Sequence, residues 1–204
     1  MSITTITKIA DTKFLKLYNA EYINKDGESK NWSIASRKDL NTLKDNYFNG
    51  VESHIDAVII VATYVDKATY VDKATHAEEN KLVVIKQFRV PLNDYVYEIP
   101  AGLIDAGEDF ETTVKRELKE ETGLDLIKID FEKTKSKVYI SVGMTDESAA
   151  LVYCTCQGEI SKAYLEPDED IEIMLLSKQE AKSLIATNKN IDIKAFLAIQ
   201  NFIG

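Results

Sequence analysis

The stretch Gly102–Leu124 reads GLIDAGEDFETTVKRELKEETGL and joins a glycine-containing loop to a densely charged segment. Its glycines predict a loop that ends any preceding strand. Asp109 suits the N-cap of a helix that begins near Phe110, because its carboxylate can accept hydrogen bonds from the free amides of the first turn. The apolar side chains recur every four residues and predict one buried stripe along this helix: Phe110, Val114 and Leu118.

Three carboxylates, those of Glu117, Glu120 and Glu121, fall together on another face of the same helix. Like charges at this spacing destabilise an isolated helix by about 0.2–0.5 kcal/mol per pair, so a purely structural helix would avoid them. Hard divalent cations such as Mg²⁺ or Mn²⁺ bind carboxylate oxygens and keep waters for substrate phosphates. The acidic ridge therefore indicates a metal platform, and the alternative is a solvated acidic helix face.

The spacing of Gly102, Glu108 and the run Arg116–Leu124 resembles the complete signature of the Nudix hydrolases. The segments Lys86–Arg89 and Tyr97–Gly102 are similar to those of the ADP-ribose pyrophosphatase branch of that family. The close similarity spans residues 81–124, and the remainder of the chain resembles the branch only loosely.

Composition and charge exclude several classes of protein. The chain has 204 residues, 45% of them hydrophobic and 29% charged, which fits a soluble globular protein with a sizeable core. Its formal net charge of −9 and its lack of a Lys/Arg cluster argue against nucleic-acid binding. No stretch nears the roughly 20 apolar residues of a membrane span, and the start at Met1 lacks the features of a signal peptide, so we expect a cytoplasmic protein that does not contact a membrane.

Periodicity predicts a mixed α/β chain. Strands are expected at residues 14–23, 32–36, 55–64, 81–88, 95–99, 126–131, 137–141, 149–156 and 171–176. Two helices capped by Ser177 and Asp192 follow, the second with the inner stripe Phe196, Ile199 and Phe202. We expect an N-terminal β-hairpin module over residues 1–50 and a Nudix-type α/β/α sandwich around a mixed sheet over residues 51–204.

Three smaller features complete the pattern. Residues 38–54 are polar and carry no clear periodicity. The hexapeptide Thr63–Ala68 recurs as Thr69–Ala74 and predicts a lengthened hairpin loop without a function of its own. Cys154 and Cys156 lie on one face of a strand and are expected to be buried apolar fillers, since partner ligands for zinc are scarce.

The resemblance implies which residues carry the chemistry. The backbone carbonyl of Ala101 and the carboxylates of Glu117 and Glu121 would bind the metal, with Glu120 as a further ligand or base. Arg116 would orient a neighbouring glutamate. Glu108 would support the site through hydrogen bonds.

The resemblance leaves the general base open between two loop glutamates. Glu147, in the loop Ser141–Glu147, is the first candidate, and Glu169 is the second. The alternative for either is an exposed loop carboxylate. Many ADP-ribose hydrolases read Ser-Pro-Gly where this chain has Val142 between Ser141 and Gly143, so the specific substrate stays open.

Substrate binding is likewise implied by the resemblance. Arg89 would contact the diphosphate, because a guanidinium fork matches a pair of phosphate oxygens, and Glu98 belongs to the same substrate-binding segment. The alternative for Arg89 is an ion pair at the edge of the sheet. Trp32 and Arg37 would hold the adenosine, often across a homodimer, whereas the alternative for Trp32 is packing against the main core.

The leading hypothesis is Mg²⁺-dependent hydrolysis of ADP-ribose to AMP and ribose 5-phosphate. Its rivals are the same chemistry on another nucleoside diphosphate sugar or on a dinucleotide such as NADH or diadenosine polyphosphate. A rival from another class is a non-catalytic ligand sensor on the same fold.

Overall fold

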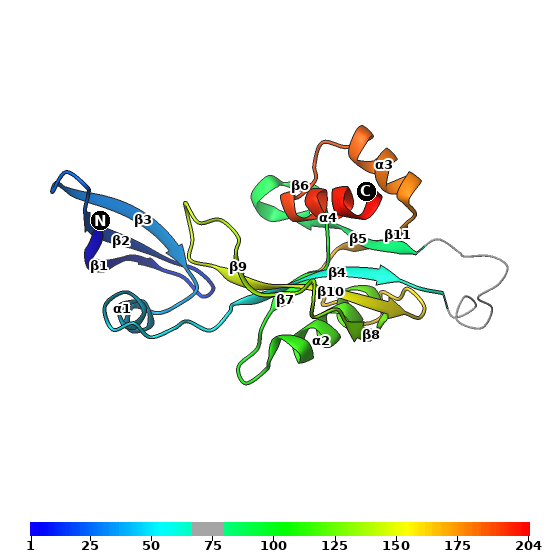
Figure 1. The fold of residues 1–204 in the computed structure, drawn as a ribbon, viewed down its shortest axis with the longest axis horizontal. Helices are drawn as coiled ribbons and strands as arrows, with labels where there is room; N and C mark the ends of the chain where they lie inside the picture. The colour runs from blue at the N-terminus through cyan, green and yellow to red at the C-terminus, as the bar shows by residue number, and fades with distance from the viewer. Residues whose placement is uncertain (67–79) are drawn as a thin grey trace. The chain divides into compact units, whose positions relative to one another are not determined.

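A computed structural model describes residues 1–66 and 80–204, whose elements are drawn in Figure 1. Contacts divide the chain into two compact units: a first unit of residues 1–56 with 137–149, and a second unit of residues 57–136 with 150–204. The boundary expected at residue 50 stays a prediction, and the contacts also group residues 137–149 with the N-terminal segment. Residues 67–74, most of the repeated hexapeptides, lie outside the described residues.

The first unit is a three-stranded antiparallel sheet covered by one helix. Its strands lie in the order β1 (Ser2–Asp11), β2 (Lys16–Ile23) and β3 (Ser29–Ser36), and its helix is α1 (Leu40–Phe48). The expected hairpin is therefore present as β2 and β3. β1 was not predicted, because only Ile6 of that strand is buried and its apolar and polar residues alternate only weakly.

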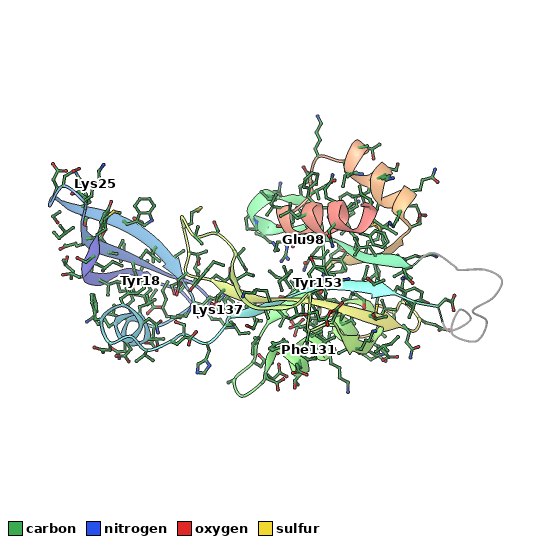
Figure 2. The ribbon with its side chains drawn as sticks, in the orientation of Figure 1. Tyr18, Lys25, Glu98, Phe131, Lys137 and Tyr153 are labelled. Carbon is green, nitrogen blue, oxygen red and sulfur yellow. The ribbon has the colours of Figure 1, made fainter. Side chains whose placement is uncertain are left out.

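The core of the first unit also explains α1. Ile6, Tyr18 and Leu43 are buried together, and Tyr18 is labelled in Figure 2. Asp39 caps α1 by accepting a hydrogen bond from the Thr42 amide at 2.9 Å. Residues 38–54 thus hold a capped helix whose apolar face is too narrow to show in the periodicity.

The larger sheet has eight strands in the order β11-β5-β4-β10-β8, with β6, β7 and β9 paired to β5, β4 and β10. Their bounds are β4 (Ala57–Tyr64), β5 (Lys81–Arg89), β6 (Asp94–Glu98), β7 (Ala101–Leu103), β8 (Asp125–Ile129), β9 (Lys135–Tyr139), β10 (Ser148–Gln157) and β11 (Ile171–Leu176). The 3₁₀ turn η2 (Val90–Leu92) joins β5 to β6. β11 and β6 run antiparallel to β5, whereas the Asp56 and Val65 amides donate to the carbonyls of Ser148 and Cys156, so β4 and β10 run parallel. The sheet is mixed, as expected.

Helices cover both faces of this sheet in the second unit (Figure 1). α2 (Phe110–Thr122) packs against β4, β7 and β8, while α3 (Lys178–Thr187) and α4 (Ile193–Ile203) pack against β5 and its neighbours. The expected α/β/α sandwich is confirmed. Among the described residues, no helix has the length and apolar character needed to cross a bilayer.

Two local expectations were wrong. The predicted inner stripe of α4 contained Phe196, but this ring is 38% exposed, and Ala195, Ala198 and Ile199 are the buried residues. Small residues on the inner face allow α4 to lie close to its neighbours. The loop expected at Gly102 begins later, because Ala101–Leu103 pair with β4 as strand β7.

The expected burial of the cysteines is confirmed, with Cys154 4% and Cys156 0% exposed.

Candidate active site

Helix α2 carries the acidic ridge of the second unit, and the sequence defines both of its ends. The Asp109 side chain accepts a hydrogen bond from the Thr112 amide at 2.8 Å. Gly123 ends the helix in the left-handed region, with a φ of 76°. Val114 and Leu118 are fully buried and hold the helix against the sheet. This packing brings the glutamates of the helix beside β7.

Glu121 is a buried carboxylate with one direct partner in the main chain. It is only 4% exposed, and its Oε2 accepts a hydrogen bond from the Ala101 amide at 3.1 Å. Burial raises the pKa of Glu121 well above its ordinary value, and the nearby charges of Glu117 and Glu169 raise it further. The Ala101 amide and the Arg89 charge oppose that shift. Negative charge at Glu121 is therefore only partly compensated.

Glu117 lies beside Glu121 and depends on a glycine for its position. Its side chain is 12% exposed, and a Cβ added at Gly102 would come within 1.9 Å of its carboxylate carbon. Only glycine at position 102 therefore leaves room for this carboxylate against β7. Burial raises the pKa of Glu117, whereas hydrogen bonding from Arg116 lowers it.

Arg116 joins three carboxylates of the signature. Its Nη1 donates to Glu117 at 2.7 Å and to Glu120 at 3.0 Å, and its Nη2 donates to Glu108 at 3.0 Å. Nη2 also donates to the Leu103 carbonyl at 3.0 Å, which ties the guanidinium to β7. The guanidinium thus holds several glutamates in place, and its part in catalysis stays a prediction.

Thr113, which was not predicted as a site residue, supports Glu108 from the buried side of α2. Thr113 is fully buried, and its hydroxyl donates to Glu108 Oε2 at 2.9 Å. Hydrogen bonds from Arg116 and Thr113 lower the pKa of Glu108, so this carboxylate is held ionised. The available signal was the four-residue spacing of Thr113, Glu117 and Glu121, which places all three on one helix face.

Arg89 and Glu98 face each other at adjacent strands. Arg89 Nε and Nη2 donate to the two oxygens of Glu98 at 2.5 and 2.8 Å, a bidentate arrangement. Glu98, labelled in Figure 2, is 6% exposed, whereas the Arg89 side chain is 42% exposed. Hydrogen bonding to Glu98 is the main cause that raises the pKa of Arg89. The ion pair considered as the alternative for Arg89 is therefore present, and the exposed part of the guanidinium can still meet a substrate.

Glu169 belongs to the loop before β11 and approaches the same site. Its carboxylate accepts a hydrogen bond from the Glu166 amide at 2.9 Å. Its charge contributes to the raised pKa of both Glu117 and Glu121. The second unit thus gathers the expected metal-binding residues and one of the two candidate bases.

The first unit holds three of the expected residues: Trp32, Arg37 and Glu147. Arg37 Nε donates to Glu147 Oε1 at 2.9 Å, and the Glu147 side chain is only 23% exposed. Glu147 is therefore not a freely exposed loop carboxylate. Trp32 is 52% exposed, and its indole N–H donates to the Gly143 carbonyl at 3.2 Å. Within the first unit the Trp32 side chain borders an open cavity of about 250 Å³ that also touches Tyr139 and Met144. Adenosine binding by Trp32 and its packing against the main core both stay predictions.

The donor set beside β7 suits a hard divalent cation. In the part of the chain that the structure describes, no three Asp, Glu, His or Cys side chains form a complete metal cage. Mg²⁺ is usually bound by one or two carboxylates together with waters and substrate phosphates, so it does not need such a cage. Burial raises the pKa of both Glu117 and Glu121, and the charge of Glu117 raises that of Glu121 further, so a cation would stabilise the two ionised carboxylates.

Known proteins share part of this sequence. An ADP-ribose pyrophosphatase of Bacillus subtilis (strain 168) is 38% identical over 128 residues, which are 60% of this chain and 65% of that protein. A methanol dehydrogenase activator of Bacillus methanolicus is 33% identical over 126 residues, again 60% of this chain and 65% of that protein. The chain thus spans less than two thirds of the length of these relatives.

A solved structure described as an ADP compounds hydrolase shares the fold. Its TM-score is 0.66 with 16% sequence identity, and the match covers 99% of this chain and 93% of that chain. Residues 71–197, more than half of the sequence, match the family model described as the NUDIX domain. The chain therefore belongs to the NUDIX family.

Proposed function

We propose that this protein is a hydrolase that cleaves the diphosphate of ADP-ribose, giving AMP and ribose 5-phosphate. The main support is the pair of buried carboxylates, Glu117 and Glu121, held against β7 by Gly102 and the Ala101 amide. The similarity to an ADP-ribose pyrophosphatase supports the choice of substrate. A different sugar attached to the same ADP would meet the same diphosphate-binding groups.

The Ala101 carbonyl, Glu117 and Glu121 would hold a divalent cation, with Mg²⁺ as the first choice and Mn²⁺ as the second. Such a cation would neutralise the diphosphate oxygens and make the attacking water more acidic. Glu120 is 44% exposed at its side chain, so it can serve as a further ligand or as a base. Arg116 keeps Glu117 and Glu120 in place through its hydrogen bonds.

Protein groups would bind the substrate and move the proton. The partly exposed guanidinium of Arg89 offers its remaining donors to the diphosphate while Glu98 fixes its orientation. Glu147 is the first candidate base and Glu169 the second. The hydrogen bond from Arg37 at 2.9 Å orients the Glu147 carboxylate, as a positioned base requires.

The adenosine end is assigned to Trp32 and Arg37, in a cytoplasmic homodimer. Trp32 presents a half-exposed ring beside a cavity, which suits stacking of a base.

We expect Trp32→Ala to raise KM about tenfold, because stacking on an aromatic ring contributes roughly 1–3 kcal/mol. The fall in kcat should be smaller, and an unchanged KM would remove Trp32 from the binding site. Light scattering on the full chain tests the dimer.

The proposed reaction is tested by product analysis with a small panel: ADP-ribose, another ADP-sugar, a UDP-sugar, NADH and diadenosine polyphosphate. We expect AMP and ribose 5-phosphate from ADP-ribose in the presence of Mg²⁺. A preference for a diphosphate without adenine would replace the proposed substrate. ADP-ribose that stays intact after long incubation with Mg²⁺ or Mn²⁺ would favour a ligand sensor.

The metal platform is tested by Glu121→Gln, which removes one charge without a change in volume. We expect turnover to fall by about a hundredfold or more, with circular dichroism unchanged, because a ligand of the proposed cation is lost. Glu111→Gln is the matched control, since Glu111 lies in the exposed first turn of the same helix. Activity of Glu121→Gln within a few-fold of the parent protein would show that the ridge is not the metal site.

A further inference from the structure

A buried cluster of charges in the first unit lies outside the residues assigned above. The Lys38 ammonium donates to both oxygens of Asp56, at 3.0 and 3.1 Å, and to Asp146 Oδ2 at 2.9 Å. The side chains of these three residues are only 10%, 11% and 18% exposed. One cation thus faces two carboxylates with little water to screen them.

The cluster connects three segments that are distant in the sequence. Lys38 follows β3, Asp56 precedes β4, and Asp146 lies in the loop before β10. Asp56 Oδ2 also accepts hydrogen bonds from the Ser148 amide at 2.9 Å and from the Ser148 hydroxyl at 3.1 Å. Asp146 and Ser148 are therefore both anchored, and the residue between them is Glu147.

Further hydrogen bonds hold the same loop. The Glu147 amide donates to Thr145 Oγ1 at 3.1 Å, and the Ala35 amide donates to the Met144 carbonyl at 2.9 Å. Arg37 reaches the Glu147 carboxylate itself at 2.9 Å. The main chain of Glu147 is thus fixed from both sides, and its side chain is aimed by a single guanidinium.

A contribution to stability is one role of this arrangement, and its geometry indicates a second. Removing three charged groups from water has a cost that their attraction often fails to recover. Burial lowers the pKa of Lys38, but the hydrogen bonds to Asp146 and Asp56 more than offset that effect, so the pKa is raised and the lysine stays charged between its two partners. The geometry of the cluster also suits holding the loop in one conformation.

We propose that Lys38 is a positioning residue for Glu147, acting through Asp56 and Asp146. This inference rests on the proposed function, in which Glu147 is the first candidate base. A carboxylate that accepts a proton must lie within hydrogen-bond reach of the attacking water, so a loop that shifts its main chain lowers turnover more than binding.

The first test compares Lys38→Met with Lys137→Met in the full-length protein. Lys137, labelled in Figure 2, is a partly buried lysine of the same unit that donates to the Ser53 carbonyl at 3.0 Å. We expect Lys38→Met to lower kcat for ADP-ribose about 10- to 100-fold, as a misplaced catalytic group does. KM should stay within about twofold, and Lys137→Met should leave both constants unchanged. Unchanged kcat in a folded Lys38→Met would overturn the inference.

The second test is a double-mutant cycle with Glu147→Gln. If Lys38 acts through Glu147, Lys38→Met should have little further effect once Glu147 has lost its charge. A merely structural role predicts that both losses multiply, and this result would also overturn the inference. So would full activity of Glu147→Gln, because no base would then be left for Lys38 to position.

A milder variant guards against a protein that does not fold. Asp56→Asn keeps the volume and leaves Lys38 paired with Asp146, so circular dichroism should stay unchanged while kcat falls about 3- to 10-fold. The same lack of additivity with Glu147→Gln is expected. Failure of the proposed function differs from failure of the Lys38 inference, because only in the first case would the parent protein leave ADP-ribose intact.

Discussion

At the scale of single residues, the site depends on the missing side chain of Gly102 as much as on the carboxylates of Glu117 and Glu121. Gly102 supplies no charge and no hydrogen-bonding side chain, yet its missing Cβ is the space that the Glu117 carboxylate occupies. The Ala101 amide next to it then fixes Glu121 at 3.1 Å. Two consecutive residues of β7 thus position two carboxylates of α2 by different means.

Gly102→Ala is the corresponding prediction. The added methyl group would lie within 1.9–2.3 Å of the Glu117 carboxylate, so that side chain must move. We expect affinity for Mn²⁺, measured by titration calorimetry, to fall at least tenfold and turnover to fall with it, since one ligand is displaced. Secondary structure should be retained. Unchanged affinity for Mn²⁺ would show that Glu117 does not bind the cation.

At the scale of elements, α2 combines a conventional architecture with an unusual charge pattern. Its caps, Asp109 and Gly123, and its buried residues, Val114 and Leu118, would suit any helix packed on a sheet. Its glutamates do not, because burial raises the pKa of Glu117 and Glu121, and the charges of neighbouring carboxylates raise both further. Burial of the apolar face therefore stabilises the position of the helix, whereas burial of the two glutamates opposes it.

This pattern predicts how stability depends on pH and on metal. The unfolded chain releases these two protons near the ordinary pKa of glutamate, about 4.5, whereas the folded protein retains them to higher pH. Between those limits the folded state binds more protons, so without divalent cations these two groups make the free energy of unfolding fall as pH rises.

Mg²⁺ should reverse that trend, because a cation binds the deprotonated carboxylates. We expect Mg²⁺ at one fixed concentration to raise Tm more at pH 8 than at pH 5, by thermal unfolding followed with circular dichroism. In Glu121→Gln this difference should shrink. An equal rise in Tm at both pH values in the parent protein would contradict a site made of these carboxylates.

At the scale of the whole molecule, the expected residues are divided between two compact units. The first carries Trp32, Arg37 and Glu147 together with the Lys38 cluster, and the second carries the signature helix. The sheet core of the second unit includes both cysteines, Cys154 and Cys156, which are free thiols. Their reactivity is therefore a probe of whether that core opens.

We expect neither thiol to react with a thiol reagent at pH 8 in the native protein. Burial raises the pKa of Cys154 to about 12 and raises that of Cys156 as well, so the reactive thiolate is scarce and shielded. Both should react at once in denaturant, which serves as the control. Rapid labelling of either cysteine under native conditions would show that β10 is not buried as described.

Local sequence rules predicted the elements that are amphipathic and capped. The strand at residues 81–88, the helix that begins after Asp109 and the helix capped by Ser177 all carry their own period or cap. The same rules failed at β1 and α1, where few residues are buried, and at Phe196, where neighbouring helices decided which face lies inside. The local periodicity of apolar residues does not show which side chains other helices and strands will cover.

The same division applies to the site. The sequence by itself determined that Glu117 and Glu121 share one helix face, because a four-residue spacing brings side chains together in any α-helix. Only the tertiary structure decided that Ala101 binds Glu121, that Arg89 pairs with Glu98, and that Lys38 meets Asp56 and Asp146. These contacts join residues far apart along the chain or on different strands, and their partners are chosen by how the packed elements meet.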